Sequence, residues 1–143
     1  FDRVGTHGRH PMLSLAAVDA EFTGIGRDWT RTAEALHRRG LLDDTTAARI
    51  SALQRFGEQI GNSDMHLGNL SLAPDGDRFG LLPVYDMLPM ALAPWHGELP
   101  STFPPRPAPD GLPPAVTAAL RDYRRRLRSD ARVSGTFREI HEA

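Results

Sequence analysis

The segment LSLAPDGDRFGLL, residues 70–82, is best explained as a β-hairpin. Leucine and serine alternate over residues 70–72, which is the two-residue period of a strand with one buried face. The Asp-Gly pair within residues 74–77 is a strong turn signal, and residues 79–82 can then pair back antiparallel. Because both ends of a hairpin meet at its open end, the residues just before and just after this segment should lie close together.

Helical patterns flank the hairpin. Residues 28–40 and 43–60 repeat apolar side chains three or four positions apart, and each run begins at an aspartate and ends before or at a glycine. Residues 95–114 hold seven prolines and predict an extended connector. Two helices are expected within residues 115–143, the second capped by Thr136. The predicted fold class is α+β, mainly α, with one hairpin.

Composition excludes several functions. The absence of cysteine rules out disulfides and thiolate metal ligands within the chain and fits a reducing cytoplasm. A net charge of −1 predicts no general attraction to nucleic acid or anionic lipid. No apolar run approaches the ~20 residues of a membrane span. All 17 basic residues are arginine, so lysine chemistry is absent from this chain.

The loop GNSDMHLGN, just before the hairpin, concentrates polar side chains. Asp64 and Asn69 are five residues apart, and Asp86 follows the second strand. Phosphoryl transfer needs this combination of residues. One aspartate orients the hydroxyl nucleophile, while an amide oxygen and a second carboxylate hold Mg²⁺ on the phosphates. We therefore expect Asp64 to be catalytic and Asn69 and Asp86 to be metal ligands.

Simpler explanations exist for each residue taken alone. Asn, Ser and Asp are common in loops because their side chains hydrogen-bond the nearby backbone, and Gly is common there because it turns freely; Asp86 could cap a helix. His66 could contact phosphate or only fix the loop. The arginine-rich run at residues 124–128 is explained more simply as a solvated helix face than as an RNA or phosphate site. The joint spacing of the acids and the amide across a hairpin nevertheless favours a functional site.

At these motifs the sequence resembles a known family. GNSDMHLGNLSL (residues 61–72) and LLPVYDMLPMALAP (residues 81–94) together resemble the C-terminal kinase lobe of HipA-like serine/threonine kinases, which are bacterial toxins of toxin–antitoxin modules. The resemblance extends over residues 1–94. It implies an enzyme with a kinase-like C-lobe that uses ATP and Mg²⁺, a protein substrate with a Ser or Thr acceptor, and an antitoxin protein as partner.

The resemblance also assigns roles by position. Asp64 matches the catalytic-loop aspartate, and Asn69 and Asp86 match the magnesium ligands. Three further residues match positions that border the phosphates, the nucleotide and the adenine, respectively: His66, Tyr85 and Phe1.

Two departures from the family pattern matter. Gly68 stands where HipA has a lysine, and nothing in this chain matches the Gly-rich loop or the strand lysine of a small lobe. Those parts would have to precede Phe1. We therefore expect residues 1–143 to be one domain of a longer protein, inactive when isolated.

Two rival functions remain open at this stage. The motif D-x-H-x-G-N also occurs in aminoglycoside- and choline-type phosphotransferases. A small molecule as the phosphate acceptor is therefore one alternative. A non-catalytic module that binds a partner protein is the other. The segments FDR and VYDMLP favour the HipA-like interpretation.

Overall fold

The computed structural model describes residues 3–4, 6, 8–98, 100 and 111–142. Phe1, expected at the adenine, therefore lies outside the described residues. The chain divides into two compact units. Phe1–Gln54 and Met65–Met87 form the first, and Arg55–Asp64 and Leu88–Ala143 form the second.

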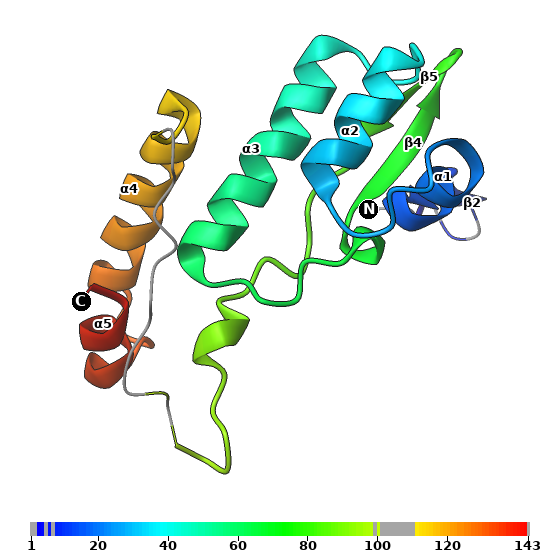
Figure 1. Cartoon of the computed structure of the whole chain (residues 1–143). Helices are drawn as coiled ribbons and strands as arrows, with labels where there is room; N and C mark the ends of the chain where they lie inside the picture. Colours follow the sequence, from blue (N-terminus) through cyan, green and yellow to red (C-terminus); the bar gives the residue numbers. More distant parts are fainter. Residues whose placement is uncertain (1–2, 5, 7, 99, 101–110, 143) are drawn as a thin grey trace. The chain divides into compact units, whose positions relative to one another are not determined.

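The first unit contains a three-stranded antiparallel sheet in the order β3-β4-β5. Two of its strands, β4 and β5, are labelled in Figure 1. The strands β4 (Ser71–Asp75) and β5 (Arg78–Leu81) form the predicted hairpin, which turns at Gly76 with φ +63°. A third strand, β3 (Leu13–Ser14), pairs with β4 and was not predicted. It is only two residues long, so it carries no alternating pattern.

Another pair of short strands precedes this sheet. Strands β1 (Arg3–Val4) and β2 (Gly8–Arg9) pair antiparallel with each other and form a separate two-stranded sheet.

Three helices cover the sheet of the first unit: α1 (Leu15–Phe22), α2 (Trp29–Arg38) and the first turns of α3 (Asp44–Ile60). The Asp28 carboxylate caps α2 by accepting from the Arg31 amide at 2.9 Å, as predicted. The core is apolar and draws on all of these elements. Its fully buried members include Leu15, Trp29, Ala33, Leu36, Ile50, Leu70 and Leu72.

The second unit is mainly helical. It contains the end of α3, the short 3₁₀ turn η2 (Met90–Leu92), α4 (Pro114–Ser129) and α5 (Gly135–Glu142). Phe56 of α3 and Tyr123 of α4 pack edge to face, with ring centroids 5.9 Å apart. The predicted Thr136 cap is wrong. The Phe137 amide instead donates to the Ser134 hydroxyl at 3.2 Å, so the cap lies two residues earlier and α5 begins at Gly135.

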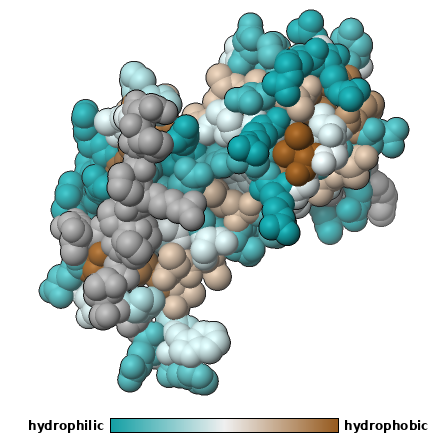
Figure 2. Space-filling model, in the orientation of Figure 1, coloured by the Kyte–Doolittle hydropathy of each residue, from teal (hydrophilic) through white to brown (hydrophobic). Residues whose placement is uncertain are grey.

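The visible surface is largely hydrophilic. On the face shown in Figure 2, strongly hydrophobic residues reach the described surface only in small areas. No helix that the structure describes has both the length and the apolar character that a membrane span requires.

Candidate functional site

A single 3₁₀ turn, η1 (Leu67–Asn69), carries the first predicted metal ligand. His66 caps it, because its ring Nδ1 accepts a hydrogen bond from the Gly68 amide at 3.0 Å. The His66 carbonyl accepts from the Asn69 amide at 3.1 Å and from Nε1 of the buried Trp29 at 3.0 Å. The loop is thereby anchored to α2. Of the two roles left open for His66, the structure displays the loop-fixing hydrogen bond.

Gly68 leaves room for the imidazole that caps this turn. A Cβ at position 68 would lie 2.8 Å from both Cε1 and Nδ1 of His66. Any larger residue would therefore have to displace the ring and lose its hydrogen bond. Glycine at position 68 therefore fits the local packing of this loop.

Tyr85 ties the segment after β5 to this turn. Its phenol donates to the Gly68 carbonyl oxygen at 2.7 Å. The phenol proton is used in that bond, so the buried Ser71 hydroxyl at 3.1 Å is the donor to the Tyr85 oxygen. The Leu82 amide also donates to the Ser71 carbonyl at 3.0 Å. These bonds hold the chain that leads into Asp86 against the turn that carries Asn69.

Asp86 has an unusual backbone. Its φ is +56°, in the left-handed region that few residues other than glycine adopt, although aspartate is one of the more tolerant. A residue held there costs on the order of 1–3 kcal/mol, and such residues gather at functional sites. The side chain is exposed. The hairpin therefore presents the carboxylate at some conformational cost.

The donor chemistry of these two residues suits magnesium. Asn69 supplies an amide oxygen and is almost fully buried, at 7% exposure, whereas Asp86 supplies a carboxylate. Hard oxygen ligands of this kind are what Mg²⁺ prefers, and it commonly takes only one or two from protein. Among the described residues, no three His, Cys, Asp or Glu side chains gather as a metal cluster. An ion here would thus depend on substrate oxygens as well.

Asp64 belongs to the second unit, where a turn presents it to solvent. Its amide donates to the side-chain oxygen of Asn62 at 3.0 Å, and the amide of Asn62 donates to the Gly57 carbonyl near the end of α3. Asn62 is buried, at 6% exposure. It fixes the backbone that leads into Asp64 by an Asx-type turn, a positioning role that the sequence motif alone did not reveal.

A buried carboxylate on α1 was also missed from sequence. Asp19 accepts hydrogen bonds from the Ile25 and Gly26 amides, both at 2.9 Å, and from the Thr23 hydroxyl. Burial by itself would raise its pKa, but these bonds outweigh that effect and leave the pKa below its ordinary value. All of these partners lie in the turn between α1 and α2, so Asp19 is structural.

The chain is similar to known proteins over most of its length. The sequence profile of the HipA-like C-terminal domain family matches residues 1–140. Toxin YjjJ of Escherichia coli (strain K12) is 43% identical over 94 residues. That alignment covers 66% of this chain but only 21% of the toxin, so the chain spans a small part of the relative's length. The matched family is the one that the paired motifs resemble.

Proposed function

The chain belongs to the family of HipA-like C-terminal domains, and on that premise we propose that it is the C-lobe of a protein kinase. The reaction is transfer of the ATP γ-phosphate to a serine or threonine hydroxyl. The observation that carries this proposal is the 2.7 Å bond from Tyr85 to the Gly68 carbonyl. It supports convergence of an amide and a carboxylate from segments on either side of the hairpin.

The proposed roles follow from donor chemistry. The Asn69 side-chain oxygen and the Asp86 carboxylate hold the metal, and Mg²⁺ when bound neutralises charge on the phosphates. Asp64 orients the acceptor hydroxyl and accepts its proton. Tyr85 acts as a positioning residue, because its phenol is committed to the loop.

His66 has a second role in this proposal. With Nδ1 accepting from Gly68, the proton of the neutral ring resides on Nε2. His66 is exposed, so Nε2 is able to donate to a phosphate oxygen while Nδ1 maintains the turn. Phe1 remains the residue proposed to border the adenine.

A partner protein is part of the proposal. YjjJ is named a toxin. We extend that character to the protein that contains this chain, whose activity would then be restrained by an antitoxin protein.

The test is phosphate transfer from radiolabelled Mg-ATP by the intact protein, compared with its Asp86→Asn and Asp64→Asn variants. Each substitution should lower the rate by about a hundredfold or more, because it removes a charged group from the reaction centre. Asp75→Asn, at an exposed end of β4, is the control and should retain the rate.

Other outcomes would contradict the proposal. An Asp86→Asn variant with near-normal transfer would remove the metal role. Transfer to an aminoglycoside or choline, with none to protein, would instead support the small-molecule phosphotransferase. A wild-type protein that binds its partner but transfers no phosphate would support the non-catalytic module.

A further inference from the structure

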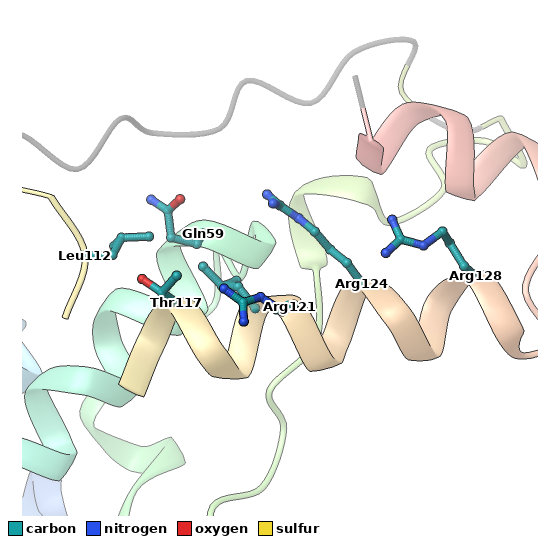
Figure 3. Close-up of a pocket in the computed structure, with 7 residues that line it drawn as sticks. Gln59, Leu112, Thr117, Arg121, Arg124 and Arg128 are labelled. Atoms are coloured by element: carbon teal, nitrogen blue, oxygen red, sulfur yellow. The ribbon is translucent and has the colours of Figure 1, made fainter. Parts of the chain in front are cut away.

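A groove of about 350 Å³ runs along α4 in the second unit (Figure 3). Its lining combines three arginines of α4 with apolar and amide side chains: Arg121, Arg124, Arg128, Leu112, Leu120 and Gln59. None of these residues has a role in the proposed phosphate transfer. Arg124 and Arg128 belong to the run at residues 124–128, for which a solvated basic face is the simpler prediction from sequence, and Arg121 lies just before that run.

The structure divides the arginines of α4 into two groups. Arg125 and Arg126 both pair with the Asp122 carboxylate, the latter at 2.8 Å, so their charge is partly neutralised. Arg121 and Arg124, three residues apart, line the groove instead. Within the described part of the chain, neither of these two guanidinium groups has an ion pair or hydrogen bond.

The groove offers a row of cations beside an apolar surface. Positions 121, 124 and 128 span roughly 10 Å along the helix axis at 1.5 Å per residue, which exceeds the size of a single phosphate. Figure 3 shows their side chains distributed along the helix, with Gln59 and Leu112 towards its N-terminal end. Leu120 lies among the lining residues and is only 5% exposed.

We propose that this groove docks an acidic peptide segment of a partner protein, one whose carboxylates alternate with apolar side chains. The carboxylates would bind the arginines, which suit bidentate recognition, and an apolar side chain would cover Leu112 and Leu120. Nucleic acid is a poorer match. The chain has a net charge of −1, and Asp122 offsets two of the other arginines on the same helix.

The test uses the intact protein and a fluorescein-labelled twelve-residue peptide in which glutamate and leucine alternate, with binding followed by anisotropy. Replacing Arg121 and Arg124 together by glutamine should weaken binding by about tenfold or more, since each loses a charged contact. The matched control replaces Arg125 and Arg126 by glutamine. It removes the same formal charge outside the groove and should change the affinity by less than about threefold.

Two further probes make the result specific. A peptide with glutamine in place of glutamate should bind at least about tenfold more weakly than the acidic peptide. An Arg124→Glu variant should lose the acidic peptide and gain a lysine–leucine peptide, which would show that position 124 contacts the ligand directly.

The proposal is overturned if the two double variants weaken binding equally, because the effect would then be general charge attraction. It is also overturned if a twelve-nucleotide single strand binds more tightly than the acidic peptide and competes with it. All four arginines are exposed, so the variants should fold, and circular dichroism verifies this. An Asp86→Asn variant, which lacks a proposed metal ligand, should still bind the acidic peptide. The docking result is thereby tested separately from the kinase proposal.

Discussion

The Tyr85 phenol donates a 2.7 Å hydrogen bond to the carbonyl oxygen of Gly68, which joins the two segments that carry the proposed metal ligands. Asn69 directly follows one partner and Asp86 directly follows the other. The bond therefore acts between the turn before β4 and the chain after β5, where backbone pairing has ended. Its removal offers a way to loosen the candidate site without touching a ligand.

Tyr85→Phe should reduce phosphate transfer more than it reduces stability. The variant loses two hydrogen bonds, one to Gly68 and one from Ser71, each worth about 1 kcal/mol in unfolding free energy. A small displacement of reacting groups, by contrast, can cost about a hundredfold in rate. Urea unfolding and initial rates measure the two effects. The magnesium concentration for half-maximal rate should also rise, which a purely structural effect would not produce.

Ser71→Ala is the matched control for this change. It removes the second hydrogen bond of the phenol but leaves the bond to Gly68 in place. The rate of this variant should stay closer to wild type than that of Tyr85→Phe. Equal rates for the two variants would show that the tether to Gly68 has no special importance.

The contact between Gly68 and His66 predicts an energetic coupling. Gly68→Ala places a Cβ 2.8 Å from the His66 ring, so the ring must move and its bond to the turn is lost. The cost should be about 1 kcal/mol or more. In a His66→Ala background the same substitution should cost less, giving a coupling energy of roughly 0.5–2 kcal/mol in a double-mutant cycle. If the losses of unfolding free energy from Gly68→Ala and His66→Ala simply added in the double variant, the packing explanation would be contradicted.

Local features of the fold were predictable because the sequence encodes them within a few residues. The Asp28 cap, the turn at Gly76 and the apolar face of Trp29, Ala33 and Leu36 all agree with the structure. Each depends on a short-range hydrogen bond, a backbone preference or a helical repeat.

Features made by distant residues could not be predicted in this way. Strand β3 exists because Leu13 pairs with Leu72, and the buried Ser71 hydroxyl finds its hydrogen-bond partner in Tyr85, fourteen residues further along the chain. The Asp19 carboxylate likewise gains its role from a turn that folds back on it. For the candidate site, sequence named the residues, while the link through Tyr85 appeared only in three dimensions.

Asp19 should contribute to stability in a pH-dependent manner. Its pKa in the folded chain lies below the ordinary value of 3.8, so the unfolded state binds the proton more readily. The stabilisation that ionised Asp19 gives to the folded state is fully present above the ordinary pKa. It is lost as the pH falls through the lower pKa of the folded state. Asp19→Asn should lower the unfolding free energy at neutral pH. It should also make the unfolding free energy fall less steeply as the pH is lowered into the acid range.

Unfolding free energies from urea titrations between pH 2 and 7 would measure this effect. Asp77→Asn, in the exposed hairpin turn, serves as the control for removing one carboxylate. An Asp19→Asn variant that retained the full wild-type loss of stability in acid would contradict the assignment.

The 143-residue chain by itself should bind Mg-ATP weakly. Phosphoryl transfer depends on positioning and on charge neutralisation, and kinases cover the phosphates with a glycine-rich loop and a lysine. This chain has no lysine, and its glycines match no such loop. Calorimetric titration of the chain with Mg-ATP checks this expectation. Micromolar binding would show that the site needs no small lobe.

The left-handed backbone of Asp86 separates its conformational role from its chemical one. Asp86→Gly and Asp86→Ala both remove the carboxylate, so both should abolish phosphate transfer. Their stabilities should differ, because glycine adopts φ +56° freely whereas alanine incurs a steric cost of about 1 kcal/mol there. The glycine variant should therefore be the more stable of the two. At Asp75, the last residue of β4, the order should reverse, since glycine weakens a strand by about 0.5–1 kcal/mol relative to alanine. Thermal and urea unfolding of the four variants test both orders. An Asp86→Ala variant as stable as Asp86→Gly would mean that the backbone relaxes at this position, and that its left-handed conformation is not what presents the carboxylate.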